Sequence, residues 1–193
     1  MSICLFFGTF NPIHNAHLRM ADFIKREFGF DKILFIPAFN PPHKYIEASN
    51  HRLEMVKLAI EKFEGFELSD IEFRLGNTSY SYLTILALKK IYPQEQRFNF
   101  LIGTDAFEKI ESWYEVDKLK DLVKFIVFKR ENDCDVDRFD YLKDKGFDFI
   151  FTTLDFCDIS STDIREKITV GKSLAGLISP EVEDYINANK LYR

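Results

Sequence analysis

The sequence predicts an α/β fold in which a doubly wound parallel sheet is covered by helices on both faces. Strand-like and helix-like segments alternate along the whole chain, which is the pattern of parallel strands joined by crossover helices. The strand-like runs are short and continuously apolar, as strands buried on both faces are. A chain of 193 residues without a linker-like stretch is long enough for one sizeable core. We therefore expect a single domain over residues 1–193.

The first half of the chain is expected to supply three strands and three helices. Apolar runs predict buried strands at residues 3–7 and 32–37, and a more polar strand at 66–75. Apolar residues at helical spacing predict a helix after each strand, beginning near His17 for the first. The three stripes are Leu18, Ala21, Ile24 and Phe28; Leu53, Val56, Ile60 and Phe63; and Leu83, Leu86 and Ala87.

The second half continues the alternation. Strands are predicted at residues 97–103, 124–130 and 147–154, with short helices at about 115–122 and 136–145. Ser179 followed by Pro180 is a good helix start, and it predicts a last helix to about Asn189. In sheets of this kind ligands bind beyond the carboxyl ends of the strands. The loops that follow strands are therefore the candidate binding regions.

Composition and charge narrow the class of protein. Hydrophobic residues make up 46% and charged residues 30% of the chain, the ordinary balance of a soluble globular protein. The formal net charge of −5 argues against a general nucleic-acid surface and favours small anions held in local basic pockets. We therefore expect small-molecule substrates and no nucleic-acid partner, while a homo-oligomer stays open.

The cysteines and the apolar runs predict the cellular location of the protein. Cys4, Cys134 and Cys157 are odd in number and far apart, which fits a reducing compartment without a disulfide framework. The chain starts without a basic leader region, and no apolar run approaches membrane length. We expect a cytoplasmic protein with no membrane partner.

The stretch between the first strand and the first helix is the strongest candidate site. Gly8 ends the strand and leaves room for a close backbone approach by a ligand, and Pro12 delays the helix. His14 and His17 are three residues apart, so at a helix start both imidazoles point the same way. Free amides and two imidazoles at a helix N-terminus favour phosphate. A zinc site or plain helix-cap histidines are the alternatives, but no third ligand is nearby.

This stretch resembles the GxFxPxHxxH signature of HxGH-type nucleotidyltransferases, a branch of Rossmann-like α/β enzymes. The departures are Ala16 for the usual glycine and Phe7 where a second glycine often stands. The resemblance implies that His14 and His17 contact the α and β phosphates of ATP as catalytic residues. It also implies ATP contacts by the other matching positions, Gly8, Thr9 and Phe10.

The loop after the second strand carries Asn40, Pro41, Pro42, His43 and Lys44. By itself it could be a stiff surface loop with a solvated lysine. All four histidines of the chain, however, lie in its first 51 residues, in or beside these two loops, which favours a polyphosphate site. The stretch resembles the PPHK segment of bacterial nicotinate-nucleotide adenylyltransferases. That resemblance implies a catalytic Lys44 and a His43 near the phosphates on the acceptor side.

The loops after the third and fourth strands supply the expected acceptor site. Ser79, Tyr80 and Ser81 resemble a Ser-Tyr-Thr segment of the same family, although Leu83 replaces its acidic residue. Ser79 or Ser81 would also suit a helix N-cap, and both roles are compatible. The family resemblance extends to Trp113 and Tyr114, and it implies that Trp113 stacks on nicotinate while amides near Tyr114 and Ser81 hold the carboxylate. A partly buried anchor is the alternative for this single tryptophan.

Two further segments are expected to bind ATP. Gly103 and Asp105 follow a buried strand, where glycine gives access and a carboxylate accepts hydrogen bonds from ribose hydroxyls, although Asp105 also suits a helix cap. Residues 159–165 read ISSTDIR and start a helix that Ser161 or Thr162 would cap, with Arg165 one turn in. The fork of Arg165 suits phosphate oxygens. ISSTxIR resembles the second nucleotidyltransferase signature, which implies a catalytic Arg165 and ATP contacts by Ile159, Ser160, Ser161 and Thr162.

Together these segments predict adenylyl transfer from ATP to nicotinate mononucleotide, which gives deamido-NAD and pyrophosphate in NAD biosynthesis. Mg²⁺ is expected as the cofactor, bound mainly through the phosphates of ATP and without a dedicated protein site. Alternative acceptors are nicotinamide mononucleotide, phosphopantetheine or, with CTP, a polyol phosphate. A non-catalytic nucleotide-binding protein of the same fold is the alternative outside enzymes, while a tRNA-charging enzyme would need a longer, more basic chain.

Overall fold

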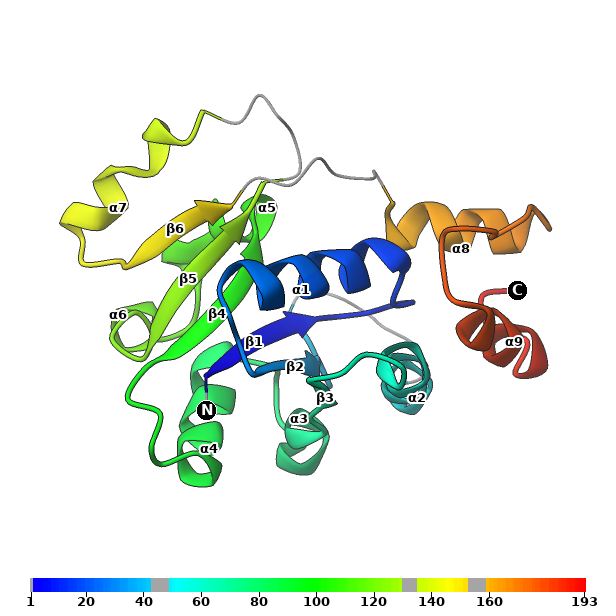
Figure 1. Cartoon of the computed structure of the whole chain (residues 1–193), viewed down its shortest axis with the longest axis horizontal. Coiled ribbons are helices and arrows are strands. Elements are labelled where there is room, and N and C mark those ends of the chain that lie inside the picture. The colour runs from blue at the N-terminus through cyan, green and yellow to red at the C-terminus, as the bar shows by residue number, and fades with distance from the viewer. Residues whose placement is uncertain (1, 43–48, 130–134, 153–158) are drawn as a thin grey trace.

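One parallel six-stranded sheet forms the centre of the molecule (Figure 1). The structure, a computed structural model, describes residues 2–42, 49–129, 135–152 and 159–193. The strand order is β3-β2-β1-β4-β5-β6, and every neighbouring pair is parallel. The strands are β1 (Ile3–Gly8), β2 (Lys32–Pro37), β3 (Phe66–Leu68), β4 (Phe98–Gly103), β5 (Val123–Phe128) and β6 (Phe149–Thr152). The predicted fold class is confirmed.

Helices connect the strands and cover both faces of the sheet. The first half contains α1 (Asn15–Glu27), α2 (Ser49–Ile60), α3 (Ile71–Leu75) and α4 (Ser81–Ile91). The second half contains α5 (Thr104–Phe107), η1 (Ile110–Ser112), α6 (Val116–Leu119), η2 (Asp137–Phe139), α7 (Tyr141–Asp144), α8 (Ser161–Thr169) and α9 (Pro180–Ala188), where η marks a 3₁₀ helix. Among the described residues, no helix is both long and apolar enough to cross a membrane.

The core divides into two clusters because successive side chains of a strand point to opposite faces. Cys4 and Phe6 of β1 lie in the cluster that α1, α2, α8 and α9 cover. Ile3 and Leu5 lie in the other, which α3 to α7 cover. This double covering explains why the strands are apolar throughout and why a period of two is absent from their sequences.

The register of the strands places the candidate loops at one edge of the sheet. Gly8 pairs with Pro37 and Gly103 with Phe128, so β1, β2, β4 and β5 end together. β1 lies between β2 and β4, where the order of the strands along the chain reverses. Figure 1 shows α8 and α9 at the end of the molecule toward which β1 runs. Ligands of such sheets bind at this switch point.

The predicted strand at 66–75 is wrong beyond its first three residues. Only Phe66–Leu68 pairs with β2, and the chain then forms α3, which ends at Gly76 with a left-handed φ of 65°. Ile71 and Glu72 are consecutive and both buried, which a strand with one face in the core does not allow. Ile71, Phe73 and Leu75 alternate with charged residues, so this single turn of helix shows the period of two that is typical of a strand.

Several helix boundaries also differ from the prediction. α1 begins at Asn15, two residues before His17, and the predicted helix at 115–122 is only the four-residue α6. The region 136–145 contains η2 and α7 in place of one helix. In α2 the buried stripe includes Arg52, Met55, Val56 and Ala59, whereas Leu53 is half-buried. Residue 130 and residues 153–154 of the last two predicted strands lie outside the described residues.

Candidate active site

The loop between β1 and α1 turns sharply around Phe10. Phe10 has a left-handed φ of 46° and is 1% exposed, and its ring lies over Gly8. A Cβ at Gly8 would come within 2.6 Å of that ring. We predicted that Gly8 leaves room for a ligand, but the space above it is filled by Phe10. Gly8 is therefore needed for the turn, and the buried Phe10 side chain supports it.

His14 and His17 are brought together at the start of α1, as the spacing predicted. His14 is the N-cap, is 5% exposed, and its ring stacks on that of His17 with centroids 3.5 Å apart and planes 22° apart. The His14 N–H donates to Nδ1 of His17 over 3.2 Å. A ring whose Nδ1 accepts carries its proton on Nε2. His17 is thus a neutral imidazole with Nε2–H as a donor, which suits a phosphate oxygen.

Helix α8 holds this loop from the other end of the chain. Arg165 Nη1 donates to the carbonyl of Asn11 over 2.8 Å, and Nη2 donates to Oγ1 of Thr162 over 3.1 Å. The Ser161 hydroxyl donates to the carbonyl of Pro12 over 2.8 Å. The predicted cap residues are wrong, because Ser160 is the N-cap and accepts from Asp163 N–H. Ser161 is instead turned toward the loop, while Ile159 is buried beside it.

Segments that the sequence did not single out hold the same loop. Tyr192 donates its hydroxyl proton to Oδ1 of Asn11 over 2.7 Å, and burial raises the pKa of this phenol. Asn15 N–H donates to the carbonyl of Leu177 over 2.8 Å. No local pattern marks Tyr192 or Asn11 in the sequence, since the two residues are 181 positions apart.

On the opposite side of β1, the predicted acceptor segment forms the start of α4. The N-cap is Tyr80 and has no side-chain cap, so the prediction that Ser79 or Ser81 caps this helix is wrong. The Ser79 hydroxyl accepts from Asn40 N–H over 2.9 Å, and Ser79 N–H donates to the Asn40 carbonyl over 2.9 Å. Ser81 is the first helical residue. The segment is thus tied to the loop after β2.

Aromatic rings line the region between α4 and α6. The Tyr80 ring stacks on Tyr114 with centroids 4.5 Å apart, and Tyr114 is exposed. Trp113 is half-buried and lies against Phe100 of β4 with centroids 5.9 Å apart, and Phe7 lies against the same Phe100. Tyr114 and Tyr80 therefore present an accessible aromatic surface, and the neighbouring Trp113 packs as a partly buried side chain against the core.

The end of β4 is open where ATP is expected. A Cβ at Gly103 would meet nothing within 4 Å, so the backbone there is accessible. Asp105 is exposed and lies in the first turn of α5, whose N-cap is Gly103, so the alternative role of Asp105 as a helix cap is wrong. Thr104 donates its hydroxyl proton to the carbonyl of Phe128 over 2.8 Å, which fixes the ends of β4 and β5.

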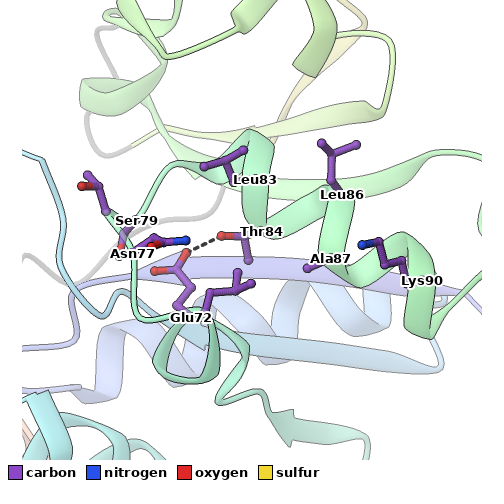
Figure 2. A pocket seen from close by; sticks show the side chains of 10 residues that line it. Glu72, Asn77, Ser79, Leu83, Thr84, Leu86, Ala87 and Lys90 are labelled. Atoms are coloured by element: carbon purple, nitrogen blue, oxygen red, sulfur yellow. Dashed lines mark hydrogen bonds between the residues drawn. The ribbon is translucent and has the colours of Figure 1, made fainter.

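A shallow cavity of about 200 Å³ lies between α3 and α4. Figure 2 shows Glu72 and Thr84 side by side in its lining, with the Thr84 hydroxyl bonded to the Glu72 carboxylate. Of the predicted site residues, only Ser79 is among those that line this cavity. Because ligand pockets usually enclose about 300–1,000 Å³, a whole mononucleotide does not fit there.

Two predicted site residues lie outside the described residues, namely His43 and Lys44. Over the ranges that the structure describes, no group of three or more His, Cys, Asp or Glu is placed to hold a metal ion. The groups gathered at the end of β1 are instead amides, imidazoles and a guanidinium. Such groups attract anions.

Comparison with known proteins agrees with this arrangement. The family model described as cytidylyltransferase-like matches residues 5–167. The probable nicotinate-nucleotide adenylyltransferase of Clostridium tetani is 38% identical, over 98% of each chain. The nicotinate-nucleotide adenylyltransferase of Bacillus subtilis is 37% identical, over 98% of this chain and 97% of its own. The chain belongs to the nicotinate-nucleotide adenylyltransferase family.

Solved structures of nicotinate-nucleotide adenylyltransferases share the fold. The nicotinic acid mononucleotide adenylyltransferase of Plasmodium falciparum, solved in complex with NaAD, superposes with a TM-score of 0.83. It is 24% identical, and the match covers 99% of this chain and 97% of that one. The fold of this family member is therefore that of a Rossmann-like nucleotidyltransferase.

We predicted no role from the sequence for two buried charged residues of this family member. Arg52 is 1% exposed and Glu72 is 3% exposed. A signal for Arg52 was available, since it falls on the apolar stripe of α2 at helical spacing from Met55 and Val56. Glu72 could not be recognised because its segment was read as a strand.

Proposed function

We propose that this chain transfers the adenylyl group of ATP to nicotinate mononucleotide and releases pyrophosphate. The stacked His14 and His17 rings at the start of α1 carry this proposal, because they present a neutral Nε2–H donor at the switch point of the sheet. The full-length relatives from Clostridium tetani and Bacillus subtilis support the choice of acceptor.

The chemistry requires no nucleophilic side chain. A phosphate oxygen of the acceptor forms a bond to the α-phosphorus of ATP, and the bond from that phosphorus to the bridging oxygen breaks, so pyrophosphate leaves with the electron pair. The phosphate monoester is already a charged nucleophile. Cys4 is fully buried, and burial raises the pKa of its thiol, so it stays protonated inside the core. The protein has to align the substrates and stabilise charge.

The roles of the phosphate-binding residues follow from their donors. His17 would donate from Nε2 to an α-phosphate oxygen, and His14, stacked on it, would face the β-phosphate. Arg165 and Lys44 would neutralise the leaving pyrophosphate, with Arg165 also fixing Asn11. Backbone amides of Thr9 and of residues 160–162 complete this anion site. Such preorganised donors act without reorganising at the moment of transfer.

Ribose and pyridine would bind on either side of β4. The open backbone at Gly103 and the nearby Asp105 suit the ribose hydroxyls of ATP. The surface of Tyr80 and Tyr114, together with the half-buried Trp113 next in the chain, suits a planar pyridine ring. Amides near Ser81 would receive the nicotinate carboxylate, since Ser81 is at the N-terminus of α4.

Mg²⁺ fits the site as a partner of the substrate rather than of the protein. The donors gathered at the end of β1 bind anions, so the cation would arrive on the phosphates of ATP. Mg²⁺ keeps several water ligands and needs few from the protein, and it would supply charge neutralisation there.

The composition of the chain supports a proposal about where the enzyme acts and which partners it has. We propose a cytoplasmic enzyme whose partners are ATP and nicotinate mononucleotide, without nucleic-acid or membrane partners. The net charge of −5 and the widely spaced cysteines support this setting. Assembly as a homo-oligomer is tested by the molar mass of the purified protein in solution.

An end-point assay with Mg²⁺, ATP and one acceptor at a time tests the proposed function. Nicotinate mononucleotide should be converted well ahead of nicotinamide mononucleotide, with one pyrophosphate released for each dinucleotide formed. Turnover with phosphopantetheine alone would contradict the pyridine pocket but keep the phosphate site. Failure with every acceptor would contradict the enzymatic proposal.

A further inference from the structure

Arg52 and Glu72 are buried charged side chains to which the proposed chemistry gives no role. They lie on α2 and α3 and are 1% and 3% exposed. Burying a charge costs free energy unless hydrogen bonds compensate for the lost water. The partners of the two side chains therefore indicate what the burial achieves.

Arg52 joins the loops after two neighbouring strands. Its Nη1 donates to the carbonyl of Thr9 over 2.8 Å, and its Nη2 donates to the carbonyl of Phe39 over 3.3 Å. Thr9 follows β1 in the phosphate loop, and Phe39 follows β2. The guanidinium is planar and rigid, so two carbonyls on one fork are held at a fixed separation.

Glu72 continues this connection to the acceptor segment. Its Oε2 accepts from Phe39 N–H over 3.1 Å, and its Oε1 accepts from the Thr84 hydroxyl over 2.9 Å. Thr84 is one turn after Ser81 in α4, and Figure 2 shows it pointing at Glu72. The reciprocal pair of hydrogen bonds between Asn40 and Ser79 closes the same connection.

The two side chains thus form one continuous polar connection between the expected substrate sites. It runs from Thr9 through Arg52 to Phe39, and from Phe39 through Glu72 to Thr84. The hydrogen bond between Glu72 and Thr84 is buried, and the other three are part-buried, so the connection is partly shielded from water. Shielded hydrogen bonds resist small displacements better than exposed ones.

We propose that Arg52 and Glu72 are positioning residues that set the distance between the ATP loop and the acceptor segment. The inference rests on the proposed function, since it assigns ATP to the first site and the mononucleotide to the second. In-line transfer needs the reacting atoms about 3–3.5 Å apart, and a displacement of about 1 Å costs roughly a hundredfold in rate. Loss of the connection should therefore lower kcat and leave the binding of each substrate nearly unchanged.

The variant Arg52→Lys tests this directly, because a lysine ammonium keeps the charge but cannot hold two carbonyls in a planar fork. We expect kcat to fall by about tenfold to a hundredfold, while KM for ATP and KM for the acceptor each change by less than about threefold. Glu72→Gln keeps the shape and loses one acceptor, so its kcat should fall less. The double variant should lose little beyond Arg52→Lys, since both changes break one connection.

Arg97→Lys is the matched control. Arg97 also donates to backbone carbonyls, those of Lys120 and Val123, but it lies at the start of β4, at the opposite edge of the sheet. All variants are compared below their unfolding temperatures, so that the assay counts folded protein. If kcat of Arg52→Lys stays within about twofold of Arg97→Lys, or if the loss is confined to KM for ATP, the positioning role is wrong.

Hydrogen exchange provides a readout that does not depend on turnover. In the wild-type protein, Mg²⁺ with ATP should protect residues 9–17 and also residues 38–42 and 77–84. In Arg52→Lys the protection should stay within residues 9–17. The same pattern in both proteins would overturn the inference. Wild-type protein that turns over no acceptor would instead overturn the proposed function, so the two failures are distinguishable.

Discussion

The two sides of the expected active site are held by different kinds of interaction. The loop after β1 is fixed through its backbone, since Thr9, Asn11 and Pro12 all have carbonyls that accept from distant side chains. The region around Tyr114 is held by ring contacts with Tyr80 and Tyr82. Hydrogen bonds fix direction, which aligned phosphates require, whereas stacked rings tolerate sliding, which suits an aromatic substrate.

The largest effect should come from the phosphate side. His17→Ala removes the Nε2–H donor, and loss of one preorganised donor typically costs about a hundredfold to a thousandfold in kcat. His51→Gln is the control, because His51 pairs with the Tyr185 hydroxyl between α2 and α9. Steady-state kinetics with both substrates measures the ratio. Near-normal turnover of His17→Ala would mean that the histidine pair is only a helix cap.

Arg165→Ala should give the next largest loss. It removes a charged hydrogen bond to the Asn11 carbonyl, and such bonds contribute about 1.5–3 kcal/mol, or roughly a tenfold to a hundredfold change. Arg165→Lys restores the charge without the fork, so comparison of the two variants separates loop support from phosphate contact. Equal activity of Arg165→Ala and the wild type would remove α8 from the phosphate site.

On the aromatic side the effect should be smaller and confined to the acceptor. Trp113→Leu should raise KM for nicotinate mononucleotide about twofold to tenfold, since aromatic pairs contribute about 0.5–1.5 kcal/mol beyond burial. KM for ATP should stay unchanged, and Trp113→Phe should recover much of the loss. A change in KM for ATP instead would show that the two sides are not separate.

The contribution of the Tyr192 hydroxyl to the phosphate loop can be tested by measuring the free energy of unfolding. Tyr192→Phe removes one hydrogen bond to Asn11 and should lower the free energy of unfolding by about 1 kcal/mol. Tyr141→Phe is the control, because its exposed hydroxyl binds the exposed Glu111. Urea unfolding measures both. A loss for Tyr141→Phe as large as that for Tyr192→Phe would remove the distinction between them.

The smallest effect concerns the pH dependence of stability. Burial raises the pKa of Glu72, against hydrogen bonds from Ser79, Thr84 and Phe39 N–H and the nearby charge of Arg52. A raised carboxyl pKa contributes stability that is complete below the ordinary pKa and is lost as pH rises through the folded value. As pH rises above the ordinary carboxyl pKa, Glu72→Gln should therefore gain stability relative to wild type. Urea unfolding over a range of pH measures this difference, and a flat difference for Glu72→Gln would contradict the raised pKa.

Local patterns predicted most of the fold. The strand, loop and helix around Gly8 to His17 were recognised because their chemistry lies within one short stretch, and the alternation of strands and helices predicted the parallel sheet that the structure shows. The predicted strand at 66–75 was wrong because Ile71, Phe73 and Leu75 have the period of two that is typical of a strand, although they lie on a single turn of helix. The predicted helix caps were wrong for a related reason, since either of two neighbouring serines, such as Ser160 and Ser161, suits the N-cap position.

Long-range contacts could not be predicted. Asn11, Arg52, Glu72 and Tyr192 act through partners far along the chain, and no spacing in the sequence links them. The stacking of His14 on His17 was foreseeable from a spacing of three, but its tautomer required the position of the His14 amide. The residues that hold the loop after β1 through such long-range contacts therefore could not be found from the sequence, while the predicted substrate contacts stay predictions.

The long-range contacts that hold the phosphate loop have a consequence for synthesis of the chain on the ribosome. The loop is made among the first residues, yet Ser161, Arg165 and Tyr192 contact it across separations of 149, 154 and 181 residues. At a translation rate of about 5–20 residues per second, roughly 8–36 s pass before these partners leave the ribosome. The loop expected to bind nucleotide is therefore synthesised long before the residues that hold it, and its contacts are complete only when α8 and Tyr192 have folded back onto the beginning of the chain.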